Sequence, residues 1–216
     1  MILCKSKKFI YIHCLKTAGT SIGSCLSEVC SKEDVIIGYG NKQEFCEKSP
    51  FYRKKHLSMG ELMDIKPDLD YKKYFKFGFC RNPFELAVSA FYFFKTWKLP
   101  AGTQLFASIN YKRQEAMKSM DFNDFISSEW YQRIPTIHSM LFKDDKPIVD
   151  FIGKFENIDA DFNFIKNKIC LNEDIQLLHK NKTSKPIDIR KIYSSASKKI
   201  VEEKNAKDLE YFKYKY

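Results

Sequence analysis

The segment Phe9-Ile-Tyr-Ile-His-Cys-Leu-Lys-Thr-Ala-Gly-Thr-Ser21 contains the order of residue types that decides the fold. Its β-branched and aromatic start is typical of a buried strand. The small and polar residues 14–19 predict a tight loop. A helix should follow, because apolar residues recur over 22–29 at the spacing of one helical face, and Thr20 or Ser21 can cap it. The segment therefore predicts a strand, a tight loop and a helix in succession.

The same order recurs further along the chain. Residues 74–80 read as a central strand, followed by Asn82 as a helix cap and Pro83 at the first position of a helix that runs to about Thr96. Residues 148–155 predict a later strand, which precedes another amphipathic helix. Alternating strands and helices favour an α/β fold, in which a central parallel sheet is flanked by helices in three layers.

Shorter signals add three elements to this outline. Residues 34–37 can form a short strand, and Ser58 and Glu61 have the spacing of a capping box that starts a helix directly after His56. Residues 98–120 contain Pro100 and Gly102 among mixed charges, which suggests a mobile lid.

Composition limits the class of protein. The 216 residues are 44% hydrophobic and 15% aromatic, enough to build the core of a single domain over 1–216. The seven cysteines include no Cys-x-x-Cys pair, so they are expected to be reduced thiols rather than a disulfide framework or a zinc knuckle. The sequence shows no apolar stretch long enough for a transmembrane segment, and a cytoplasmic location is expected. The net charge of +10 favours an anionic partner such as phosphate groups, nucleic acid or an acidic glycan.

The loop at 14–21 has the features of a phosphate-binding site. A loop that leads into a helix N-terminus favours an anion, Lys16 adds a full positive charge, and Gly19 lets the backbone approach closely. In a Walker A sequence the lysine follows the second glycine, whereas Lys16 precedes Gly19, so an ordinary ATPase loop is a poor match. A strand-to-helix turn with an incidental lysine is the alternative interpretation.

Arg81 and Ser89 form a second candidate site. Arg81 ends the central strand, and Ser89 lies two turns into the helix that follows. Ligands bind beyond the carboxyl ends of parallel strands, so Arg81 should meet the loop at 14–21 across one cleft. Because arginine suits a terminal phosphate, the two sites together describe a ligand with two separated phosphates.

These regions resemble the carbohydrate sulfotransferases that use 3′-phosphoadenosine 5′-phosphosulfate (PAPS), in their membrane-associated, bacterial and uronosyl branch. Residues 9–21 are similar to the family's 5′-phosphosulfate loop, residues 79–91 to its 3′-phosphate motif, and residues 150–157 and 208–214 to its later strand and C-terminal signature. Two residues depart from the pattern: Leu15 stands where the family usually has proline, and Leu86 where it often has a second arginine. The resemblance implies a P-loop-like three-layer sandwich.

The resemblance also implies roles for individual residues. Lys16 would contact the 5′-phosphosulfate, and the residues that would wrap this group are Thr17, Ala18, Gly19, Thr20 and Ser21. Arg81 and Ser89 would hold the 3′-phosphate. Lys182 and Thr183, within the basic loop 180–185, would close over the nucleotide, although a solvated lysine loop would look the same.

A general base is needed to activate the acceptor hydroxyl. His56 is favoured, because its segment resembles the base-bearing segment of the uronosyl branch and histidine titrates in the required range. His13 falls in the first strand and should be buried, and His179 belongs to the proposed nucleotide loop. His138 is the reserve candidate, followed by the carboxylates Glu61 and Glu44.

The expected function is transfer of a sulfuryl group from PAPS to an acceptor hydroxyl, and a carbohydrate is the favoured acceptor. Lys16 and His56 would be the catalytic residues, and no metal and no nucleic-acid partner are expected. Two alternatives remain open at this point: a P-loop-type nucleotide kinase or NTPase, and a non-enzymatic binder of polyanions.

Overall fold

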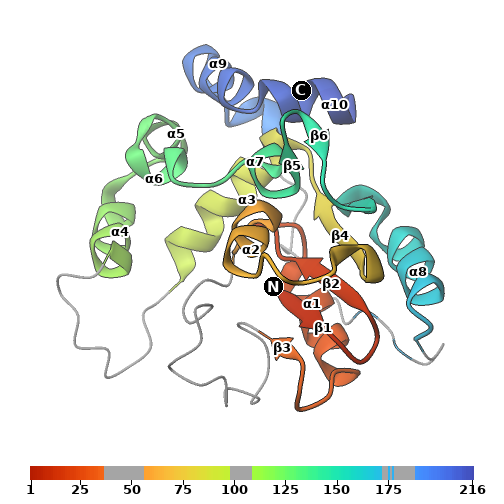
Figure 1. The fold of residues 1–216 in the computed structure, drawn as a ribbon. Helices are drawn as coiled ribbons and strands as arrows, with labels where there is room; N and C mark the ends of the chain where they lie inside the picture. The colour runs from red at the N-terminus through yellow and green to blue at the C-terminus, as the bar shows by residue number, and fades with distance from the viewer. Residues whose placement is uncertain (37–55, 98–108, 172–174, 176, 178–187) are drawn as a thin grey trace. The chain divides into compact units, whose positions relative to one another are not determined.

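The computed structural model describes residues 1–36, 56–97, 109–171, 175, 177 and 188–216 (Figure 1). Contacts divide the chain into two compact units. The first unit contains Met1–Arg81 and Ile137–Ser184, and the second contains Asn82–Thr136 and Lys185–Tyr216. A single domain over 1–216 stays a prediction. Among the described residues, no helix has the length and apolar character needed to cross a membrane.

The first unit is built on a five-stranded sheet with the order β3-β1-β2-β4-β7. Its strands are β1 (Ile2–Cys4), β2 (Phe9–Ile12), β3 (Val35–Ile36), β4 (Phe75–Cys80) and β7 (Phe151–Lys154). β2, β4 and β7 run parallel, whereas β1 is antiparallel to both of its neighbours. The α/β prediction with a mostly parallel central sheet is confirmed. The antiparallel strand β1 was not anticipated, because its apolar run is only three residues long and is followed by charge.

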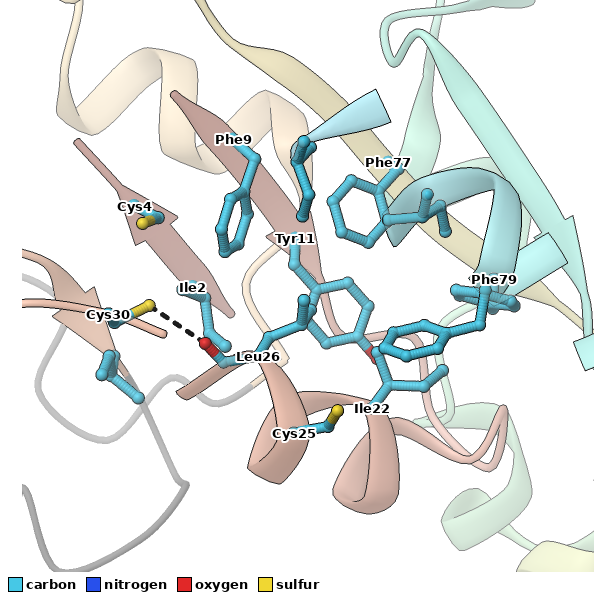
Figure 2. Close-up of a cluster of buried hydrophobic side chains, with 14 residues drawn as sticks. Ile2, Cys4, Phe9, Tyr11, Ile22, Cys25, Leu26, Cys30, Phe77 and Phe79 are labelled. Atoms are coloured by element: carbon cyan, nitrogen blue, oxygen red, sulfur yellow. Dashed lines mark hydrogen bonds between the residues drawn. The ribbon is translucent and has the colours of Figure 1, made fainter. Parts of the chain in front are cut away.

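Helices cover both faces of this sheet. The side chains that alternate along β2 and β4 towards one face pack against α1 (Gly19–Glu28) and α8 (Ile158–Lys168), as Figure 2 shows in close-up. On the opposite face, α7 (Ile137–Leu141) places the Leu141 side chain directly over Gly78, where an added Cβ would lie 2.9 Å from it. Because both faces are covered, every residue of β2 is buried, as parallel sheets require. The arrangement is the expected three-layer sandwich.

The remaining elements of the first unit follow local sequence signals. α2 (Met59–Ile65) begins with the predicted capping box, in which Glu61 N donates to Ser58 Oγ at 3.1 Å and Ser58 N donates to Glu61 Oε2 at 2.9 Å. A hairpin of β5 (Phe142–Lys143) and β6 (Lys146–Pro147) was not predicted. Its two central residues, Asp144 and Asp145, have φ of 50° and 58°, as a type I′ turn requires. The short 3-10 helices η1 (Tyr71–Lys73) and η2 (Phe155–Asn157) complete this unit.

The described part of the second unit is helical. Its elements are α3 (Pro83–Thr96), α4 (Ile109–Ser119), α5 (Phe122–Ser127), α6 (Glu129–Gln132), η3 (Ile189–Lys191), α9 (Ser195–Lys204) and α10 (Ala206–Phe212). Aromatic rings join them: Phe91 of α3 contacts Phe122 and Phe125 of α5, both at 5.7 Å between ring centroids. The Tyr193 hydroxyl donates to the Phe84 carbonyl at 2.8 Å.

Two sequence predictions fall in the second unit: the cap of α3 and the lid at 98–120. The predicted cap of α3 is confirmed, because Asn82 Oδ1 accepts a hydrogen bond from Phe84 N at 3.0 Å and Pro83 occupies the first helical position. The lid at 98–120 stays a prediction: residues 98–108 lie outside the described residues, and 109–119 form α4 instead of an irregular segment.

Candidate functional site

The loop between β2 and α1 departs from ordinary backbone geometry. Lys16 and Ala18 both have left-handed backbone conformations, with φ of 60° and 59°. Ala18 is the N-cap residue of α1, and no side chain caps this helix. Backbone turns of this kind direct N–H groups into an anion-binding concavity, to which the helix N-terminus adds its positive partial charge. The local geometry therefore favours an anionic ligand.

The prediction that Thr20 or Ser21 caps α1 is wrong. The helix begins at Gly19, so both residues lie inside its first turn, beyond the N-cap position from which a side chain can fold back onto the helix N–H groups. Thr20 is exposed and Ser21 is half-buried. Their hydroxyls therefore lie at the start of the helix without serving as its cap.

Two residues of the predicted phosphate-binding set hold the loop in shape. Thr17 is fully buried, and its hydroxyl donates to the Cys14 carbonyl at 3.0 Å. The predicted role for Thr17 was contact with the ligand through backbone and hydroxyl donors. The structure engages the hydroxyl inside the loop, and the backbone contact stays a prediction. Gly19 lies directly against the His13 ring, and a Cβ at this position would overlap the ring. Glycine is required here by a close approach of side chain to backbone, although its φ is ordinary.

Lys16 and Arg81 meet at this loop, as the positions of their strands predicted. Arg81 Nη1 donates to the Lys16 carbonyl at 3.2 Å, and the guanidinium lies 4.0 Å from the centroid of the Phe155 ring. Burial, together with the positive charge of Arg81, lowers the pKa of the Lys16 ammonium to about 8. Two cations held close together are electrostatically unfavourable in the free protein. An anion bound between them would relieve this repulsion.

His56 is linked to the same loop through His13. The His56 Nδ1 lies 3.0 Å from the His13 carbonyl oxygen, and the two rings are in edge contact with centroids 4.6 Å apart. Because a carbonyl can only accept, Nδ1 must carry the proton, and in the neutral ring Nε2 then holds the lone pair. His13 is buried, as predicted, with 4% of its surface exposed. The structure adds that His13 lies between Gly19 and the proposed base, a role that the sequence did not reveal.

The other candidate bases have different surroundings. His138 Nε2 lies 3.0 Å from Asp145 Oδ1, and its ring stacks on Phe142. Glu61 accepts hydrogen bonds from the backbone and hydroxyl of Ser58 in the α2 capping box, which gives its carboxylate a structural role. Glu44 and His179 lie outside the described residues.

The rest of the predicted nucleotide site is only partly described. Ser89 is half-buried in α3 of the second unit. Lys182 and Thr183 lie outside the described residues. The roles predicted for these three residues therefore stay predictions.

Comparison with known proteins decides the family. A family model described as "Sulfotransferase family" matches residues 1–215 of the chain. The chain belongs to this sulfotransferase family. An uncharacterized protein of Archaeoglobus fulgidus is 29% identical to it over 107 residues, which are 48% of this chain and 74% of that protein. No solved structure matches the chain at a comparable level of significance.

Membership sets the type of reaction. Sulfotransferases move a sulfuryl group from a donor to an acceptor, so the chain is assigned to the transferases. The strand, loop and helix at 9–28 and the strand that ends beside Arg81 lie within the matched region. Two neighbours of the site, His13 and Phe155, were not predicted to contribute to it. Contacts that join such distant parts of the chain leave no local pattern in the sequence.

Proposed function

We propose that this sulfotransferase moves the sulfuryl group of PAPS to a carbohydrate hydroxyl, with His56 as general base. The main support for this proposal is the β2–α1 loop. This loop contains two left-handed residues and leads into an α1 N-terminus that has no side-chain cap. Lys16 and Arg81 meet at the same loop. The residues present fit an anionic donor, because backbone N–H groups and two cations meet at one place. The family supports the transfer itself, and the resemblance of the motifs supports the donor and the carbohydrate acceptor.

The donor would be held by residues that follow the carboxyl ends of β2 and β4. Lys16, the backbone from Thr17 to Ser21 and the hydroxyls of Thr20 and Ser21 would bind the 5′-phosphosulfate. Arg81 with Ser89 would bind the 3′-phosphate. Arg81 has a second role in the free protein, since its hydrogen bond to the Lys16 carbonyl braces the loop. Lys182 and Thr183 would complete the nucleotide site.

The transfer needs a proton acceptor and a stabilised leaving group. The acceptor oxygen forms a bond to sulfur while the bond from sulfur to the bridging oxygen breaks, and the hydroxyl proton passes to His56 Nε2. The His13 carbonyl holds Nδ1 of His56 as the donor, which leaves the opposite nitrogen to act as the base. Lys16 would offset the negative charge that develops on the bridging oxygen.

Thermal unfolding with nucleotides tests the donor assignment. Adenosine 3′,5′-bisphosphate, the product of PAPS, should raise Tm by several degrees at about 100 times its Kd, where a ligand of the native state contributes about 2.7 kcal/mol. ADP should act more weakly, and magnesium should make no difference. A shift seen only with ATP and magnesium would support the kinase alternative instead. No shift with any nucleotide would support the polyanion binder.

The variant Arg81→Ala sharpens this test. This variant should weaken the binding of adenosine 3′,5′-bisphosphate far more than the binding of ADP, because only the former carries the phosphate that Arg81 is proposed to hold. If the affinities for both nucleotides fall equally, the role of Arg81 is limited to bracing the loop.

The acceptor is tested separately, with labelled PAPS and a panel of oligosaccharides, small alcohols and tyrosyl peptides. Labelling of the alcohols or peptides in place of the sugars would reject the carbohydrate assignment.

A further inference from the structure

A second cluster of chemically competent side chains lies away from the phosphate-binding loop. Cys4 ends β1, Cys30 follows the C-terminal end of α1, and Asp34 precedes β3. One sulfur from each cysteine and one carboxylate oxygen lie within 4.8 Å of one another. All three residues are buried, with exposed fractions of 0%, 6% and 0%. Figure 2 shows the sulfurs of Cys4 and Cys30 at the same end of the buried cluster of the first unit.

The protein backbone fixes the carboxylate in this cluster. Asp34 Oδ1 accepts hydrogen bonds from Lys5 N at 2.6 Å and Ser6 N at 3.2 Å, and Oδ2 accepts one from Ser31 N at 2.7 Å. These donors come from the β1–β2 turn and from the segment between α1 and β3. Hydrogen bonds of this kind orient a carboxylate that ligates a metal and fix its position before the metal arrives.

The two thiols are held by the sheet and by the end of a helix. Cys4 pairs with Phe9 in the β1–β2 ladder, and its Sγ donates to Asp34 Oδ2 at 3.2 Å. The Cys30 Sγ donates to the Leu26 carbonyl in the last turn of α1 at 3.3 Å. Each sulfur is therefore held by a hydrogen bond to a buried residue of the first unit.

An oxygen of Ser6 completes a set of four donor atoms. The Ser6 hydroxyl lies 3.3 Å from Cys4 Sγ and donates to Asp34 Oδ2 at 2.7 Å. Four-coordinate Zn²⁺ has bonds of about 2.3 Å to sulfur and about 2.1 Å to oxygen, which places its ligand atoms roughly 3.4–3.8 Å apart. Around Cys4 the observed separations of 3.2 and 3.3 Å need adjustments of a few tenths of an ångström. The Ser6 hydroxyl, now 2.7 Å from Asp34 Oδ2, would have to move roughly 0.7 Å away from that oxygen, and the Cys30 sulfur, which lies within 4.8 Å of the other two ligand atoms, would close in on them. Thiolate ligands favour zinc, whereas calcium and magnesium require oxygen ligands.

We propose that Cys4, Cys30 and Asp34 bind one structural Zn²⁺ ion, with the Ser6 hydroxyl as the fourth ligand. Binding breaks the two S–H bonds, releases two protons to solvent and forms two Zn–S bonds, with no change of oxidation state. Zinc takes the place of the thiol proton that Cys4 now shares with Asp34. The site would join β1, the end of α1 and the start of β3. No metal was expected from the sequence, and the seven cysteines were expected to be reduced thiols because they include no Cys-x-x-Cys pair. This proposal does not depend on the proposed function.

Metal uptake by the reduced full chain tests this proposal. The protein is stripped with a chelator, kept reduced with a phosphine, and titrated with Co²⁺ and then Zn²⁺. One equivalent of Co²⁺ should give the absorption of a tetrahedral thiolate site, Zn²⁺ should displace it with release of two protons, and Tm should rise by several degrees. No stoichiometric uptake by the reduced chain would overturn the proposal.

Cysteine variants assign the ligands. Cys4→Ser and Cys30→Ser should abolish the cobalt spectrum, while Cys25→Ser and Cys170→Ser, a buried and an exposed control, should retain it. A spectrum that survives in both ligand variants would place the metal elsewhere. If Cys4→Ser or Cys30→Ser fails to fold, the ligands are assigned on the wild-type chain instead. Its cysteines are alkylated with and without zinc, and the labelling of each cysteine is compared. Zinc should protect Cys4 and Cys30 selectively from the reagent in the partly unfolded chain, and equal labelling of all cysteines would reject the site.

Discussion

Two neighbouring strands pass into helices in opposite ways. β2 and β4 are parallel partners, with Ile12 paired to Gly78 near their carboxyl ends. The β4–α3 junction is closed by its own sequence, because the Asn82 side chain caps the helix and Pro83 brings no N–H group. The β2–α1 junction has no side-chain cap and contains two left-handed residues that are not glycine.

The difference favours the β2–α1 junction as the proposed ligand site. Left-handed geometry costs an ordinary residue roughly 1–2 kcal/mol, and such strain persists where the surrounding structure enforces it, commonly at functional sites. At the β2–α1 junction, the buried Thr17 hydroxyl and the Arg81 guanidinium enforce it. One junction stabilises the fold, whereas the other is the one that we propose keeps helix N–H groups and a lysine in place for an anion.

The largest effect is expected at His56, the proposed base beside the uncapped junction. His56→Ala should lower kcat by on the order of 10²–10⁴ while the Kd for adenosine 3′,5′-bisphosphate stays nearly constant, because a general base acts on the transferred proton and not on nucleotide binding. Steady-state kinetics and calorimetry measure the two quantities separately. His138→Ala is made in parallel, and a larger fall in kcat for that variant would move the base to His138.

The close contact at Gly19 should make the uncapped junction intolerant of a single methyl group. Gly19→Ala drives a Cβ into the His13 ring, so we expect the free energy of unfolding to fall by about 1–3 kcal/mol and kcat to fall as His13 and His56 shift. Gly60→Ala in α2 is the matched control. Its Cβ would meet nothing within 4 Å, and alanine in a helix should raise stability by up to about 1 kcal/mol. Equal losses in the two variants, measured by denaturant unfolding, would contradict the packing at Gly19.

The lowered pKa of Lys16 predicts a pH dependence for nucleotide binding. A bound phosphate favours the charged ammonium, so the complex holds this proton more firmly than the free protein does. Affinity for adenosine 3′,5′-bisphosphate should therefore fall above pH 8, the region of the free-protein pKa, by up to tenfold per pH unit. In Lys16→Arg the side chain stays charged, and this fall should disappear. An equal slope for the variant and the wild-type chain would place the titrating group elsewhere.

Local signals explain which parts of the structure could be predicted. The Asn82 and Pro83 pair and the Ser58 and Glu61 capping box act within four residues, and both helices begin where these residues place them. The buried strands at 9–12 and 75–80 are also visible as apolar runs in the sequence. The short strand β1 was missed, because three apolar residues are too few to distinguish from a charged terminus.

The sequence predicted which strands and loops form the candidate site, but not the contacts between its side chains. The sequence indicated that Lys16 and Arg81 should meet, because both follow the carboxyl ends of strands. It did not indicate that Thr17 bonds within the loop, that Gly19 packs on His13, or that the His13 carbonyl orients His56. The last contact joins residues 43 positions apart, and such a pair is set by the packing of the whole unit.

The smallest predicted effects have opposite signs at the two junctions. Asn82→Ala removes the cap of α3 and should lower the free energy of unfolding by about 1 kcal/mol, whereas Asn82→Asp keeps a capping oxygen and should lose less. Ala18→Gly relieves the left-handed strain at φ 59° and should raise stability by up to about 1 kcal/mol, reduced by the greater freedom of glycine in the unfolded chain. Urea unfolding of the three variants measures these differences. A loss of stability in Ala18→Gly as large as that in Asn82→Ala would mean that the first junction depends on the Ala18 methyl group, and that the two junctions are stabilised in the same way after all.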